Sequence, residues 1–164
     1  MKEYYIVIFI FKGSRYITLW YMSDRDGFLL NKEGNKIKTF NSEIEVKEYV
    51  RKNMLDLQNG ITEVFCDETE LLNDNNVKCD LFLTFWNIMS DVASSLNINF
   101  KGDDEDKEIK SIYNKLFYGC NLPAVKNDGD NFQPKWNHKE RNLITVILKD
   151  SYNIFGPMSR FSTS

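Results

Sequence analysis

Side chains able to carry out chemistry near neutral pH are scarce in this chain of 164 residues. Histidine is the commonest general acid or base and the commonest metal ligand, yet it occurs once, as His138, in a polar stretch. Cys66, Cys79 and Cys120 are widely spaced and form no CxxC pair. This inventory lacks both a usual zinc set and a Cys–His pair. We therefore expect small buried thiols in a reducing compartment, with no metal and no cofactor.

Carboxylates are plentiful, and one run of them stands out as Asp103, Asp104, Glu105 and Asp106. Acids placed before a helix are explained by the helix macrodipole, and the same run also fits an acidic patch that binds a protein. A calcium loop needs ligands at alternating positions with a glycine in the middle, which this run lacks. The first two interpretations both remain open, and a metal site is disfavoured.

The net charge of −3 is spread unevenly along the chain. Residues 61–110 hold four Lys/Arg and twelve Asp/Glu, a net charge of −8, whereas residues 1–40 and 111–164 each carry +3. A concentration of negative charge repels phosphate backbones and attracts basic protein surfaces. The charge distribution therefore favours a protein partner over direct binding of nucleic acid.

Aromatic residues make up 14% of the chain, and two of them lie in an acidic loop. Phe132 and Trp136 accompany Asp128 and Asp130 in a stretch without periodicity, which is typical of an interface anchor with a charged rim. Packing of the same loop against the core fits the pattern equally well. We therefore expect Asp128, Asp130 and Trp136 to contact a partner and Trp136 to be at least partly exposed. Trp86 lies on a long apolar stripe, and we expect it in the core.

The hydrophobic pattern predicts an α+β fold in which an N-terminal antiparallel β-meander packs against three or four helices, all within a single domain, residues 1–164. Strands are predicted at residues 4–11, 16–22, 28–30, 36–40 and 61–65, the first of them central in the sheet. Helices are predicted from a capping box at Ser42 and Glu45, at about 77–97, and across Ile109 to a stop at Gly119. Residues 67–76 and 120–136 are predicted loops. Residues 139–155 fit a helix or a strand, and we favour the helix.

The apolar N-terminal run is too short to cross a bilayer as a helix and lacks a small-residue cleavage site. A buried strand explains it, so a cytoplasmic location without membrane association is expected.

Three stretches resemble the CdiI type of bacterial immunity protein, the antitoxins of contact-dependent growth inhibition systems. They are SIYNKLFYGCNLPAVKNDGDNFQPKW at residues 111–136, YITLWYMSDRDGFLLNKEGNKIKTFNSEIEVKEYV at 16–50 and LFLTFWNIMSDVASSLN at 81–97. The resemblance implies a non-enzymatic cytoplasmic inhibitor that binds its cognate toxin domain tightly and blocks the active site. Many such toxins are nucleases. Two alternatives stay open: a small enzyme using carboxylates, Lys or Cys120, and an adaptor without a toxin partner.

Overall fold

The most apolar segment of the chain forms the central strand of the larger sheet. In the computed structural model, β1 (Glu3–Phe11) pairs antiparallel with β2 (Ser14–Met22) and parallel with β5 (Asp56–Phe65). The structure describes residues 1–73, 76–126, 129, 131–155 and 160–164. Side chains on both faces of β1 are buried, as the central position requires: Ile6, Val7, Ile8 and Phe9. The predicted central strand is confirmed.

A two-residue turn joins β1 to β2. Phe11 pairs with Ser14, and the two residues between them, Lys12 and Gly13, have positive φ angles of 49° and 75°. Positive φ at both central positions defines the turn whose twist matches that of paired strands. The predicted hairpin is confirmed, with a tighter turn than the four-residue connection expected.

The sheet is mixed, with the order β5–β1–β2–β4–β8 and with β3 also paired to β2. The added strands are β3 (Gly27–Phe28), β4 (Ile37–Phe40) and β8 (Phe161–Ser162). A bridge between Leu30 and Ile37 closes the predicted second hairpin, which completes the antiparallel meander. β5 and β8 then join its two edges in parallel. These parallel pairings were not predicted, because they link segments far apart in the sequence.

The strand predicted at residues 61–65 is longer than expected. β5 starts at Asp56, and Asn59 and Gly60, a pair typical of turns, lie inside it. The register against β1 shifts between Leu57 and Ile61, and Gly60 has a φ of 104°. Asn59 and Gly60 form a β-bulge, and the pairing of β5 with β1 continues on both sides of this bulge.

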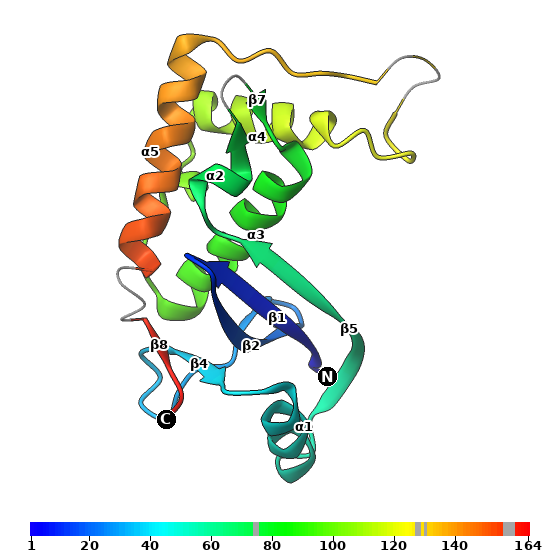
Figure 1. Ribbon diagram of the computed structural model, residues 1–164, viewed down its shortest axis with the longest axis vertical. Helices are drawn as coiled ribbons and strands as arrows, with labels where there is room; N and C mark the ends of the chain where they lie inside the picture. The colour runs from blue at the N-terminus through cyan, green and yellow to red at the C-terminus, as the bar shows by residue number, and fades with distance from the viewer. Residues whose placement is uncertain (74–75, 127–128, 130, 156–159) are drawn as a thin grey trace.

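One helix, α1 (Glu43–Lys52), covers one face of the sheet (Figure 1). Its Val46 and Val50 pack with Ile6 and Ile8 of β1 in a small hydrophobic cluster. Ser42 caps the helix as predicted, accepting a hydrogen bond from the amide of Glu45 at 3.2 Å. Ile44 and Met54, at the two ends of the apolar residues in this region, are exposed. A short helix lying on a sheet buries only its central turns, and the helix ends before Met54.

Three helices lie on the opposite side of the sheet: α3 (Cys79–Leu96), α4 (Lys107–Gly119) and α5 (His138–Phe155) (Figure 1). α3 packs on the sheet, and α4 packs on α3, farther from the strands. The three helices share a large hydrophobic cluster with Val7 and Phe9, the β1 residues that alternate with those facing α1. Trp86 of α3 is 2% exposed, so its predicted core position is confirmed. The preference for a helix over a strand at residues 139–155 is also confirmed.

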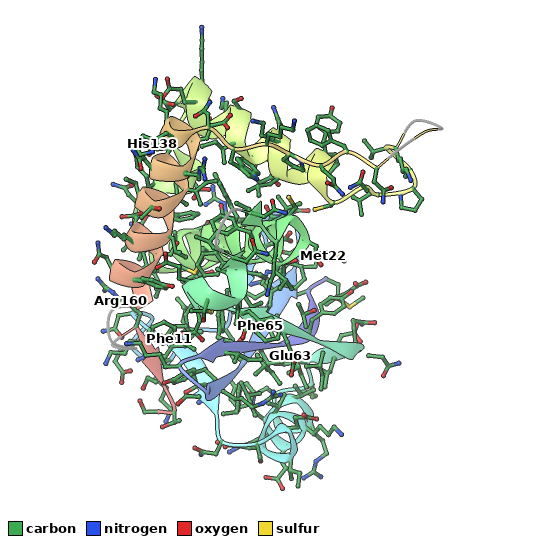
Figure 2. All side chains as sticks on the ribbon, turned by 45° about the horizontal axis from the view of Figure 1, so that its top comes forward. Phe11, Met22, Glu63, Phe65, His138 and Arg160 are labelled. Atoms are coloured by element: carbon green, nitrogen blue, oxygen red, sulfur yellow. The ribbon has the colours of Figure 1, made fainter. Side chains whose placement is uncertain are left out.

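Short elements occupy the predicted loop at residues 67–76 and the stretch that leads into α4. Residues 67–76 contain α2 (Glu68–Leu71), β6 (Leu72–Asn73) and β7 (Asn76–Val77), while η1 (Lys101–Asp103) precedes α4. The described part of residues 120–136 has neither helix nor strand, as predicted, and it projects from the end of α4 before returning to α5 (Figure 1). Figure 2 shows His138 at the end of α5 away from the sheet. No helix within the described ranges is both long and apolar enough to span a membrane.

Candidate protein-binding site

The predicted acidic run lies at the surface, between η1 and the start of α4. All four of its members are exposed, as a binding patch requires: Asp103, Asp104, Glu105 and Asp106. Each of them also has a partner within the protein. Asp104 Oδ2 accepts from Lys101 Nζ at 2.6 Å, and Glu105 forms an ion pair with Lys110. Part of the charge of the run is therefore neutralised locally.

Asp106 has a structural role. Its Oδ1 accepts hydrogen bonds from the amides of Glu108 at 2.8 Å and Ile109 at 3.2 Å, so it is the N-cap of α4. Removal of an N-cap side chain destabilises a helix by about 1 kcal/mol. Asp106 is therefore explained by its place at the start of a helix, because its carboxylate accepts hydrogen bonds from the first turn of α4.

Folding brings Asp103 and Asp104 together with two acids from distant parts of the sequence. Asp91 of α3 accepts a hydrogen bond from Trp20 Nε1 at 2.8 Å. Burial raises the pKa of Asp91 above its ordinary value, and repulsion from Asp26 and Asp103 raises it further, against the lowering effect of the Trp20 bond. We call these four carboxylates, Asp26, Asp91, Asp103 and Asp104, the acidic face.

Asp103 is held within this face by Ser90, whose Oγ donates to its Oδ1 at 2.6 Å. Burial raises the pKa of Asp103, the Ser90 hydrogen bond lowers it, and the neighbouring Asp104 raises it again, so that the net shift is upward. Two members of the acidic face are thus subject to both desolvation and like-charge repulsion. Such an arrangement disfavours anions and attracts cationic groups.

Asp26 and Asp91 were missed as site residues. Asp26 has a turn-forming role, since the Ser23 amide donates to its Oδ1 at 3.0 Å. Asp91 is a carboxylate next to Ser90, between the buried residues Met89 and Val92 of α3. That polar interruption was the available signal. Within the described ranges, no three His, Cys, Asp or Glu side chains come together as a metal site.

The second set of predicted contact residues consists of Asp128, Asp130 and Trp136. Asp128 and Asp130 lie outside the described residues. The prediction that Trp136 is at least partly exposed is wrong: its side chain is 7% exposed and belongs to the large hydrophobic cluster. Lys115 Nζ lies 5.1 Å from the centre of its ring, a cation–π contact. Trp136 is therefore part of the core and no longer a candidate contact residue.

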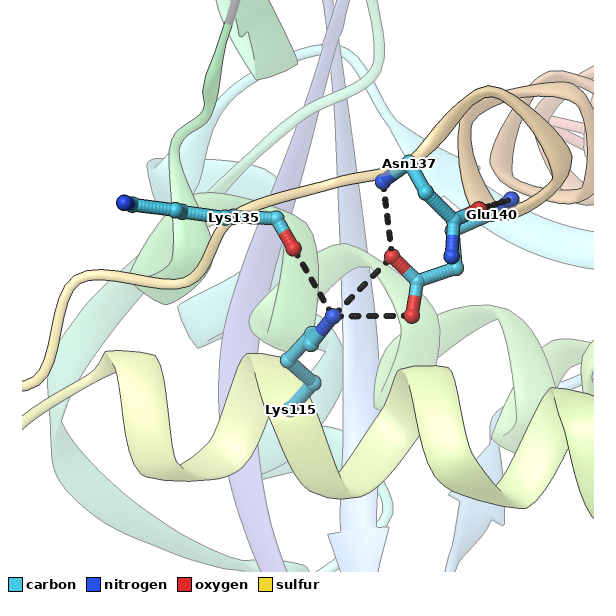
Figure 3. Close-up of polar contacts among 4 residues, drawn as sticks. All are labelled: Lys115, Lys135, Asn137 and Glu140. Atoms are coloured by element: carbon cyan, nitrogen blue, oxygen red, sulfur yellow. Dashed lines mark hydrogen bonds and ion pairs between the residues drawn. The ribbon is translucent and has the colours of Figure 1, made fainter.

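The burial of Trp136 follows from how the chain enters α5 (Figure 3). The Asn137 side chain accepts from the Glu140 amide at 2.8 Å, and Glu140 accepts from the Asn137 amide at 2.9 Å, forming a capping box. Lys115 of α4 donates to both Glu140 oxygens, at 2.8 and 2.9 Å, and to the Lys135 carbonyl at 2.8 Å. These bonds hold residues 135–137 against α4, so the ring between them packs inward.

The residues considered for catalysis have unremarkable surroundings. His138 is exposed at the start of α5, and its Nε2 lies 3.3 Å from Asn142 Nδ2. Burial raises the pKa of all three thiols: that of Cys66 far above its ordinary value, that of Cys79 to about 11, and that of Cys120 with a further contribution from Asp80. An activated cysteine nucleophile has a lowered pKa instead. These thiols are protonated at neutral pH.

Comparisons with protein-family models, with curated proteins and with solved structures found no match to this chain. A proposal about function therefore depends on the geometry and charge of its own residues.

Proposed function

We propose that this chain is an immunity protein of the CdiI type, which binds a cognate growth-inhibition toxin domain in the cytoplasm and neutralises it by covering its active site. The observation that carries the proposal is the acidic face, in which acids from the β2–β3 turn, α3 and η1 are gathered although Asp91 and Asp103 are partly desolvated. Unfavourable charge that folding retains at a surface is typical of a functional site.

A nuclease toxin is the partner whose chemistry complements this face. A cleft that binds phosphate backbones is lined with Lys and Arg, and a surface of carboxylates can occupy it in place of the phosphates. Opposite charges accelerate the encounter, and buried apolar contacts then slow dissociation. The immunity protein would thus contact the toxin directly and have no need to bind nucleic acid.

The test is complex formation with the toxin domain encoded beside this chain. The two products should co-purify, and expression of this chain should protect cells that express the toxin. Charge reversal by Asp103→Lys with Asp104→Lys should lower the association rate at low salt by about tenfold or more. Glu48→Lys with Asp56→Lys, both exposed sites near α1, is the matched control and should change the rate much less.

Absence of a complex with the wild-type chain would contradict the immunity role. Equal association rates for the two charge-reversed proteins would leave that role standing and reject the acidic face as the contact. His138→Ala and Cys120→Ala separate an inhibitor from an enzyme. We expect both variants to protect cells as well as the wild type does, whereas an enzyme relying on either side chain would lose activity with its fold intact.

A further inference from the structure

A second surface feature, distinct from the acidic face, is an open pocket of about 360 Å³ where α3 begins and α4 ends. The returning loop forms its third wall, with Asn131, Phe132 and Gln133. The loop can approach α4 closely because Gly119 has no side chain: a Cβ there would lie only 2.7 Å from Pro134 Cγ. A volume of this size suits one long side chain or a small ligand.

The polar groups of the pocket are suited to a cation. Asp80 carries the only ionised side chain among the described lining residues, because the thiols that share the pocket are protonated. Within the described part of the chain, no lysine or arginine pairs with Asp80. The exposed amides of Asn131 and Gln133 add carbonyl oxygens that can accept further hydrogen bonds.

An aromatic ring lines the same pocket, and the backbone that carries it is held by hydrogen bonds. The Asn121 side chain accepts a hydrogen bond from the Phe132 amide at 2.7 Å and donates one to the Phe132 carbonyl at 2.9 Å. One side chain thus binds both backbone polar groups of the residue that carries the ring. Asn121 itself has a φ of 51°, which asparagine tolerates better than most residues. The Phe132 side chain is 46% exposed. The pocket is therefore lined by both an accessible aromatic ring and a carboxylate.

We infer that this pocket receives an arginine side chain of the protein partner, with the guanidinium paired to Asp80, hydrogen-bonded to the loop amides and stacked on Phe132. A planar guanidinium satisfies a carboxylate with two parallel hydrogen bonds and packs against an aromatic ring, which an ammonium group does less well. The inference rests on the proposed function, because it assigns a specific contact to the basic toxin. It also places that contact away from the acidic face.

The guanidinium pocket can be tested on the isolated full chain, without the toxin. The probe is N-acetyl-arginine N-methylamide, and the corresponding citrulline derivative is its uncharged counterpart of nearly the same shape. In the ¹⁵N-labelled protein, the side-chain amide signals of Asn121, Asn131 and Gln133 should shift saturably with the arginine probe, with a millimolar Kd. The citrulline probe should leave them unchanged.

Two variants and one control make the test specific. Asp80→Asn and Phe132→Leu should each weaken binding of the arginine probe, Asp80→Asn by at least about tenfold because the charge-assisted pair is lost. Glu48→Gln removes the same charge at an exposed site on α1 and should bind the probe as the wild type does. Thermal unfolding of each variant checks that the fold is retained.

Equal shifts with both probes, or unchanged binding by Asp80→Asn, would overturn the inference. Failure here is distinguishable from failure of the proposed function. If the wild-type chain forms the toxin complex but the arginine probe does not bind, only the pocket assignment falls. If the probe binds as expected but no toxin complex forms, the immunity role falls and with it the identity of the partner that supplies the arginine.

Discussion

Asp91 combines an unfavourable environment with a specific hydrogen bond, and these two effects can be separated by mutation. Its carboxylate is half-buried, faces Asp26 and Asp103, and accepts from Trp20 Nε1. A carboxyl group whose pKa is raised by folding binds its proton more tightly in the folded state. It therefore destabilises the fold at any pH where it is charged, and this penalty disappears as the pH falls through its raised pKa.

Asp91→Asn should accordingly stabilise the protein at pH 7, because the amide keeps an acceptor for Trp20 and carries no charge. The gain should stay below about 1 kcal/mol, since the partly exposed carboxylate is screened by solvent. Urea unfolding followed by tryptophan fluorescence, at pH 7 and again near pH 3.5, measures it. The advantage over the wild type should shrink at the lower pH. A variant that is less stable than the wild type at pH 7 would show that the charged hydrogen bond outweighs the repulsion.

Two tryptophans predicted to differ in burial both lie in the core, and their replacement should show it. Trp86 contacts the rings of Phe82, Phe100 and Tyr113, with centroids 5.5–6.4 Å apart. Truncation of a buried tryptophan to alanine costs about 3–5 kcal/mol. Trp86→Ala and Trp136→Ala should therefore both lower the unfolding free energy strongly.

Trp136 differs from Trp86 in its ring nitrogen, and a second substitution tests this. Trp136 Nε1 is buried without a hydrogen-bond partner in the described part of the chain. An unpaired buried donor costs about 1–3 kcal/mol, so Trp136→Phe, which removes the donor and keeps an aromatic ring over Lys115, should cost far less than Trp136→Ala. Chemical denaturation compares the three proteins. A Trp136→Ala protein as stable as the wild type would contradict the burial of this side chain.

The first turn of α5 depends on an ion pair that links it to α4. Burial raises the pKa of Glu140, but hydrogen bonds from Lys115 and from the Asn137 amide outweigh burial, and the net shift is downward. A carboxylate with a lowered pKa stabilises the fold above its ordinary pKa. That contribution is lost as the pH falls through the lowered value.

Glu140→Gln should destabilise the protein by about 1–2 kcal/mol at pH 7, because hydrogen bonds to a charged group are lost and Lys115 is left half-buried. The difference from the wild type should vanish in acid, once Glu140 is protonated. Hydrogen exchange should show the first turn of α5 opening more often, with the amides of β1 much less affected. Equal destabilisation at neutral and acidic pH would exclude the ion pair as the cause.

The C-terminal strand β8 joins the end of the chain to the N-terminal part of the sheet. Phe161 of β8 is 9% exposed and packs edge-on against Phe9 of the central strand, with ring centroids 5.3 Å apart. The Ile37 amide donates to the Arg160 carbonyl at 2.7 Å, so the backbone of this segment is also bonded to β4. Residues 160–164 thereby cover both an edge of the sheet and part of the core.

Phe161→Ala should lower the unfolding free energy by about 3 kcal/mol, since it leaves a cavity beside Phe9. It should also expose the edge of β4, and exposed sheet edges promote aggregation. Calorimetry measures the stability loss, and light scattering during heating measures the aggregation. Ser164→Ala, at an exposed position in the same segment, is the control and should behave as the wild type. Wild-type stability of Phe161→Ala would mean that β8 contributes little to the fold.

The elements predicted correctly are those whose determinants lie within a few residues of one another. The β1–β2 hairpin needs only two apolar runs and a Lys12-Gly13 turn, α1 begins at a local capping box, and α3 carries a long apolar stripe. The exposed acidic run at residues 103–106 could also be recognised from sequence, because charged residues are mostly found at the surface. The concentration of acids and the scarcity of histidine are likewise visible in composition alone.

Tertiary packing decided the features that join distant residues. The parallel pairings of β5 and β8 depend on partners in β1 and β4, and the extent of β5 follows from that pairing. The acidic face exists because Trp20 and Ser90 position Asp91 and Asp103, which are separate in the sequence. The burial of Trp136 depends on Lys115, twenty-one residues earlier in the chain. Local patterns specify which elements form, whereas burial and charge depend on which side chains the finished fold brings together.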